Sequence, residues 1–190
     1  MRYPAHETAE KNRRILDAAA RLFRERGFLD VGVSEIMKAS GLTHGPFYNH
    51  FASKQDLLAK AVAHASADAL ADLISRPPTV EAREAYVRGY LTAEHCRSPG
   101  SGCLMASLAS DAARDPSVKP AFTAHLRRLI DRLSDHFPWH RDGKARGETI
   151  HTLAAMVGGL VLARACDDAE LADEILVEVA NRIAEDQRGD

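Results

Sequence analysis

Residues 43–54 carry hydrogen-bond donors at helical spacing, and their chemistry suits contact with a nucleic acid. Placing Phe47 and Phe51, four residues apart, toward a core turns the polar side chains of this segment outward. The residues predicted to face outward are Thr43, His44, Gly45 and Asn49. Small polar residues at the start of a helix suit the major groove of DNA, where base edges are read.

Two further residues of the segment could bind phosphate. Tyr48 flanks the outward residues, so its hydroxyl could donate to a phosphate oxygen. Lys54 stands at a predicted helix start and would add a positive charge. The alternative for Tyr48 is a ring packed on its own helix.

The elements that position these residues are predicted to be helices. Residues 8–26 repeat apolar side chains at one-face spacing, and a short helix follows over about 33–40. Gly41 allows a tight turn, a second short helix opens near Thr43, and Ser53 caps a fourth helix that runs to about 74. Two short helices joined at a glycine turn predict a helix-turn-helix.

Composition gives the same fold class. The chain has 32 Ala and 19 Leu against 24 Val, Ile and Thr together, and no stretch alternates apolar with polar residues. Alanine and leucine favour helices, whereas β-branched residues favour strands. We therefore expect an all-α protein of about nine helices.

The run from Ile36 to Leu58, IMKASGLTHGPFYNHFASKQDLL, closely resembles the DNA-binding domain of TetR-type (TetR/AcrR family) transcriptional regulators. Its lead-in, with Leu22-Phe23 and then Gly27-Phe28, matches as well. The resemblance implies a DNA-binding domain over 8–56 with a linking helix to about 74, and an effector-binding and dimerisation domain over 79–187. Met37 and Gly32 depart from the Ala and Thr that are usual in the family.

The resemblance also implies a role for each residue of the motif. By position, Thr43, Tyr48, His50 and Lys54 would contact backbone phosphates, whereas His44, Gly45, Pro46 and Asn49 would lie against base edges. Pro46 replaces a residue that usually keeps its amide, so one backbone donor near the DNA is missing.

Beyond the break at Arg76-Pro77-Pro78, helices are predicted over 80–96, 103–113, 117–136, 145–166 and 169–187. An effector chamber in this region would suit a small, largely hydrophobic ligand. Ordinary core packing is the alternative for each candidate lining residue. The candidates are Tyr86, Tyr90, His95, Cys103, Met105, Phe122, His125, Leu129 and His151, with Leu104 and Leu126 beside them.

The last two helices are candidates for a dimer interface. The helix over 145–166 is apolar almost all round, so it needs cover on every side. Gly158-Gly159 weakens a helix unless another helix approaches closely. Packing within one monomer is the plain interpretation, whereas the family resemblance implies a four-helix bundle across a two-fold axis.

The charge balance, the hydropathy and the missing motifs argue against other classes of protein. The 190 residues carry 25 Lys and Arg against 27 Asp and Glu, but residues 1–56 hold nine against seven and are slightly basic. No apolar run reaches the roughly 18 residues of a membrane span, and no secretory leader opens the chain, so we expect a cytoplasmic protein. No nucleotide loop, HExxH or Gly-x-Ser-x-Gly motif is present, which predicts no enzyme and no cofactor.

Two smaller hypotheses concern cysteine and histidine. Cys103 follows Gly102 at a predicted helix start, with Cys96 close in sequence. A helical small-molecule-binding or thiol redox-sensing protein, with weak or lost DNA binding, is therefore the alternative function. His136 and His140 bracket a proline that breaks the geometry of a zinc pair, so no metal is expected.

Overall fold

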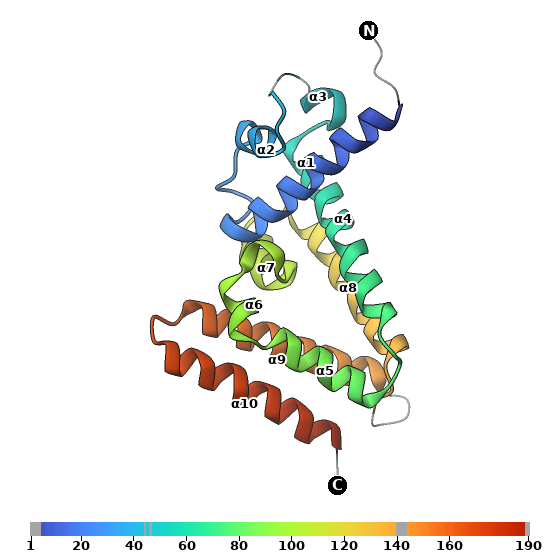
Figure 1. Ribbon diagram of the computed structural model, residues 1–190, viewed down its shortest axis with the longest axis vertical. Coiled ribbons are helices and arrows are strands. Elements are labelled where there is room, and N and C mark those ends of the chain that lie inside the picture. Colours follow the sequence, from blue (N-terminus) through green and yellow to red (C-terminus); the bar gives the residue numbers. More distant parts are fainter. Residues whose placement is uncertain (1–4, 44, 46, 140–143, 189–190) are drawn as a thin grey trace. The chain divides into compact units, whose positions relative to one another are not determined.

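The computed structural model describes residues 5–43, 45, 47–139 and 144–188 (Figure 1). All regular structure in these residues is helical, which confirms the predicted all-α class. The chain forms two compact units. The first comprises Met1–Asp68 and Cys103–His125, and the second comprises Ala69–Gly102 and Leu126–Asp190.

The first unit is built around α1 (Ala5–Arg26), which packs against α2 (Val33–Ala39) and α7 (Leu104–Arg114). It also contains α3 (Phe47–His50) and the first parts of α4 (Lys54–Ser75) and α8 (Lys119–His136). One hydrophobic core joins these elements, and its members come from both chain segments. Among them are Ile15, Phe23, Phe28, Ile36, Met37, Phe47, Phe51, Leu57, Leu104, Leu108 and Ala112.

Two glycines make the turns of this unit. Gly27 ends α1 with a φ of 84°, and its amide donates to the Phe23 carbonyl at 2.9 Å. Gly41 follows α2 with a φ of 72°, and the Arg14 guanidinium occupies the space that a Cβ of residue 41 would need. Both positions therefore favour glycine.

The start of α4 is fixed by the predicted cap. The Asp56 amide donates to Ser53 Oγ at 3.0 Å, and the Asp56 carboxylate accepts from the Ala52 amide at 3.0 Å. The first bond satisfies a backbone donor that the helix start leaves unpaired, and the second ties the residue before the cap to the first turn of α4.

The second unit contains α5 (Val80–Tyr90), α6 (Ala93–Arg97), a 3₁₀ turn at Pro99–Ser101, α9 (Ala145–Ala165) and α10 (Ala169–Arg188). Helices α9 and α10 run side by side (Figure 1). A Cβ on Gly159 would lie 3.2 Å from Val179 Cγ2, so α10 approaches the α9 backbone closely at this residue. The close helix approach that we expected therefore exists at Gly159 and lies within one chain.

The helix predicted over 80–96 is two helices, which corrects the sequence prediction. Leu91 leaves the helical region with a ψ of 65°, and Thr92 caps α6 by accepting the His95 amide at 3.2 Å. The described residues consequently hold ten α-helices rather than about nine. None of the helices in the described part of the chain is both long and apolar enough to span a bilayer.

Candidate nucleic-acid interface

Helix α3 presents polar groups outward because two aromatic rings anchor it from beneath. Phe47 is completely buried and Phe51 nearly so, with ring centroids 5.7 Å apart. Tyr48 is 71% exposed, and its ring meets Phe47 edge-on with 5.1 Å between centroids. Most of the Tyr48 side chain is therefore open to solvent, while one edge of its ring contacts Phe47.

The other outward predictions divide into described and undescribed positions. Thr43 and Asn49 are exposed, as predicted. Gly45 is also exposed, with open space where a Cβ would stand, so a partner could approach its backbone closely. His44 and Pro46 lie outside the described residues.

His50, which follows Tyr48 and Asn49 on α3, is half-buried. Burial lowers the pKa of His50 below its ordinary value, and the positive charge of Lys11 lowers it further. The free protein therefore presents a neutral imidazole here at neutral pH, able to form a hydrogen bond but carrying no charge.

Lys54 makes contacts that its sequence position did not indicate. Its ammonium donates to the Phe28 carbonyl at 2.5 Å and to the Leu29 carbonyl at 3.4 Å. It also lies 4.3 Å from the centroid of the Phe28 ring. Burial lowers the pKa of Lys54 against the opposing effect of Asp30, Asp111 and Asp115. The α1–α2 loop comprises residues 27–32. In this structure it is bound by the Lys54 ammonium, which is the group that is predicted to bind phosphate.

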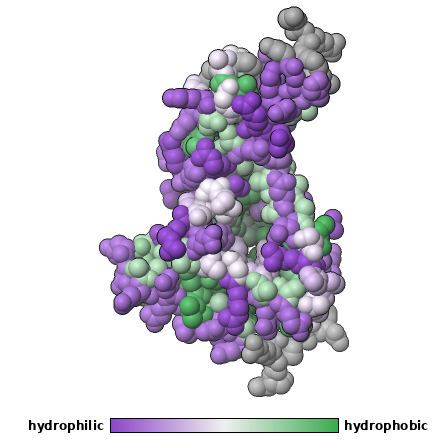
Figure 2. Space-filling model, in the orientation of Figure 1, coloured by the Kyte–Doolittle hydropathy of each residue, from purple (hydrophilic) through white to green (hydrophobic). Residues whose placement is uncertain are grey.

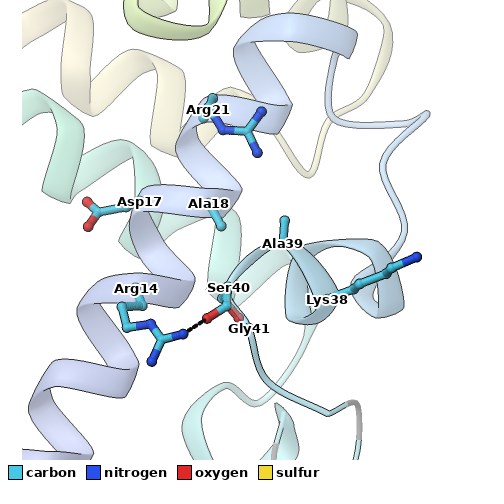
Figure 3. A pocket seen from close by; sticks show the side chains of 8 residues that line it. All are labelled: Arg14, Asp17, Ala18, Arg21, Lys38, Ala39, Ser40 and Gly41. Carbon is cyan, nitrogen blue, oxygen red and sulfur yellow. Dashed lines mark hydrogen bonds between the residues drawn. The ribbon is translucent and has the colours of Figure 1, made fainter.

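A groove of about 450 Å³ between α1 and α2 adds positive charge to the same unit (Figure 3). Arg14 donates across it to the Ser40 carbonyl, whereas Arg21 pairs with Glu25 at 2.8 Å. The exposed Lys38 lines the α2 side. The fold brings Lys38 of α2 together with the charged side chains of α1, which lie far from it in sequence.

Four predicted effector residues lie in the first unit. Met105 is buried, and Cys103 and Phe122 are half-buried, with Cys103 as the N-cap residue of α7. His125 is also buried, and its Nδ1 lies 2.8 Å from Ser66 Oγ. This hydrogen bond joins α8 to α4.

The other five lie in the second unit. Leu129 is buried, Tyr86, Tyr90 and His95 are half-buried, and His151 is exposed on α9. His95 donates from Nδ1 to the Tyr90 carbonyl at 2.7 Å, and its ring meets Tyr90 edge-on. Arg164 of α9 donates to the His95 carbonyl at 2.9 Å and the Cys96 carbonyl at 3.1 Å, which satisfies the end of α6.

The surroundings of His95 predict a pH-dependent stability. Burial lowers the pKa of His95 below its ordinary value of 6.5; the hydrogen bond to the Tyr90 carbonyl opposes this shift, and the positive charge of Arg164 adds to it. As the pH falls below 6.5 the unfolded chain binds this proton before the folded chain does, so the stabilisation present above 6.5 is lost on acidification. We expect His95→Gln to flatten the dependence of unfolding free energy on pH below 6.5, measured by denaturant titration. The exposed His151→Gln is the control, and equal slopes in both variants would contradict the assignment.

Sequence reasoning missed Arg83, the largest side chain among the fully buried ones. Its guanidinium donates to the Pro138 carbonyl and lies 4.9 Å from the Trp139 ring centroid. Near it, His136 Nε2 donates to the Arg76 carbonyl at 3.0 Å, while His140 lies outside the described residues. An arginine within a polar-looking helix gives no sequence indication of burial.

Comparison with known proteins agrees with this geometry. Residues 15–61 match the family model described as bacterial regulatory proteins, tetR family. The chain is 43% identical over 54 residues to the HTH-type transcriptional regulator AcrR of Shigella flexneri, a match that covers 28% of this chain and 25% of that protein. It is 41% identical over 58 residues to the HTH-type transcriptional repressor KstR2 of Rhodococcus jostii, covering 29% and 28%.

These sequence matches span about a quarter of the length of the curated relatives. A solved structure extends the likeness to nearly the whole chain. A TetR-family transcriptional regulator from Agrobacterium tumefaciens superposes with a TM-score of 0.73 at 26% identity, covering 92% of this chain and 98% of that one.

Proposed function

We propose that this chain, of which residues 15–61 match the model of the TetR family of bacterial regulatory proteins, is a DNA-binding transcriptional regulator of that family. The observation that carries this proposal is the outer face of α3, where Tyr48 and Asn49 are exposed above the buried Phe47. Thr43, Tyr48, His50 and Lys54 would contact phosphates, and His44, Gly45, Pro46 and Asn49 would face base edges. Lys54 would have to share its ammonium between the Phe28 carbonyl and a phosphate.

We propose that the protein acts as a homodimer on a palindromic operator, because two copies of α3 related by a two-fold axis would read two inverted half-sites. An apolar face on α9 supports a dimer through the last two helices. Ile150, Val161 and Leu162 are 45%, 41% and 59% exposed, and Gly158 has open space at its Cβ position. In Figure 2, hydrophobic surface shows over the α9 and α10 pair.

The proposed regulation is repression that a small, largely hydrophobic effector relieves. The relative named as a repressor, KstR2, supports this sign. The effector must bind one conformation better than the other, since a ligand with equal affinity for both shifts nothing. Tyr86, Tyr90 and Leu129 are the residues of the second unit that we propose to line its site, and catalysis has no part in this function.

Selection of bound fragments from a random pool of duplex DNA tests the proposal. We expect recovery of one inverted-repeat sequence with half-site centres about 34–36 Å or a multiple apart. Recovery of no sequence by the intact protein would overturn DNA recognition. A panel of hydrophobic small molecules, added to the complex with the selected DNA, then tests release.

Substitutions of Tyr48 and of Asn49 are predicted to weaken DNA binding in different ways. Tyr48→Phe removes one phosphate donor and should weaken all duplexes alike, by about fivefold for one hydrogen bond. Asn49→Ala should weaken the selected site more than random DNA, at about 1–3 kcal/mol for a base contact. Titration of both variants with selected and scrambled duplexes measures the difference. If Tyr48→Phe left both affinities unchanged, the phosphate role would be wrong.

A further inference from the structure

The α1–α2 loop is held by hydrogen bonds to both the backbone amide and the backbone carbonyl of Phe28. Its amide donates to Asp111 Oδ2 at 2.5 Å, and its carbonyl accepts from Lys54 Nζ at 2.5 Å. Asp111 belongs to α7 and Lys54 to α4, so two helices that are distant in sequence bind the backbone of one residue. A bond to a charged group is stronger than one between neutral groups, and here both bonds are of that kind.

The loop residues Gly27 and Phe28 pack closely against Asp111 and the core. Gly27 has a φ of 84°, and a Cβ on it would stand 2.9 Å from Asp111 Oδ2. The Phe28 side chain is 2% exposed and its ring centroid lies 5.5 Å from that of Phe23. The loop therefore cannot shift without breaking the bond to Asp111 or moving a buried ring.

Helix α7 shares its hydrophobic core with the helix-turn-helix unit. Leu104, Leu108 and Ala112, on one face of α7, belong to the same hydrophobic cluster as Ile36 and Phe47. Near the last turn of α7, Asp111 adds a polar contact to this apolar one. Cys103, the N-cap residue of α7, is the first residue of the second segment of this unit.

We propose that Asp111 is a positioning residue for DNA recognition, which sets the α1–α2 loop, and through it α2, by holding the Phe28 amide from α7. The inference rests on the proposed function, because DNA affinity is the property that Asp111 would control. A displacement of α7 would pull on the Phe28 amide first. Asp111 makes no contact with DNA in this scheme and acts only through the loop.

The test compares Asp111→Asn with a variant that makes the same charge change nearby. Asp115, the C-cap residue of α7, accepts from the Ser117 amide at 2.8 Å and, like Asp111, lies near Lys54, so Asp115→Asn is the matched control. The probe is the duplex selected by the wild-type protein, titrated well below the unfolding temperature at several salt concentrations. Hydrogen exchange at the Phe28 amide is followed in the same proteins.

We expect Asp111→Asn to lower affinity for this duplex by about tenfold, since a bond to a charged acceptor is lost. The dependence on salt should not change, because no phosphate contact is removed. Exchange of the Phe28 amide should become faster in Asp111→Asn and Asp111→Ala. Asp115→Asn should stay within about twofold of wild type in affinity.

Each contrary result has a separate meaning. If the wild type selects no duplex, the proposed function fails. If the wild type binds but Asp111→Asn binds equally well or more tightly, this inference fails and the proposed function stands. A lower melting temperature with unchanged affinity would show that Asp111 only stabilises the fold. Unchanged exchange of the Phe28 amide in Asp111→Ala would show that Asp111 does not hold this amide.

Discussion

Leu108→Ala is expected to lower the free energy of unfolding by about 2–5 kcal/mol and to loosen α1 and α2. Leu108 is 1% exposed and lies in the cluster that contains Phe23 and Phe28. Truncation removes three buried carbon atoms and leaves a cavity that rigid neighbouring helices fill only in part. Denaturant titration measures the loss, and hydrogen exchange locates it.

The control for Leu108→Ala is Leu153→Ala, which removes the same atoms from a buried site in the second unit. Leu153 is 4% exposed on α9. Under native conditions, we expect Leu108→Ala to speed amide exchange in α1 and α2, and Leu153→Ala to speed it in α9 and α10. Equal protection of α1 and α2 in both variants would contradict the place of α7 in the first core.

Helix-turn-helix residues were predictable because local spacing determines them. Phe47 and Phe51 face one side of any helix that contains both, and both are buried as expected. Gly27 and Gly41 stood at predicted helix ends, and both have the positive φ that favours glycine. The Ser53 cap followed from a polar residue placed before an apolar run.

What the sequence did not reveal depends on contacts between distant segments. The apolar spacing of Leu104 and Leu108 predicts a buried face but does not say which helices cover it. The break after Leu91 was missed because Tyr90 and Leu91 continue an apolar period into a segment that Thr92 then caps. The bonds of Asp111 and Lys54 to Phe28 have no local indication, since each joins residues in different elements.

The functional division of the chain also stays a prediction. The motif led us to expect a DNA-binding domain over 8–56 and an effector domain over 79–187. The compact units place Cys103–His125 with the first unit by packing. Packing and function need not share a boundary, because a helix that completes one core can still respond to a ligand bound elsewhere.

Leu162→Glu is expected to turn the proposed dimer into monomers and to lower affinity for a palindromic duplex by about 100-fold or more. Leu162 is 59% exposed on α9, in the apolar face with Val161 and Ile150. A carboxylate there would lose its hydration inside a helix–helix interface without gaining a partner. A monomer binds one half-site only and so loses the gain from binding two sites together. Sedimentation and duplex titration measure the two effects.

Ile74→Glu is the control, because Ile74 is 53% exposed and undergoes the same change of charge outside α9 and α10. We expect this variant to sediment and bind as the wild type does. Because both sites are exposed, neither substitution should alter the melting temperature of the monomer by much. A Leu162→Glu protein that stayed dimeric would place the interface elsewhere. A monomeric protein with full operator affinity would instead remove the two-fold requirement from DNA recognition.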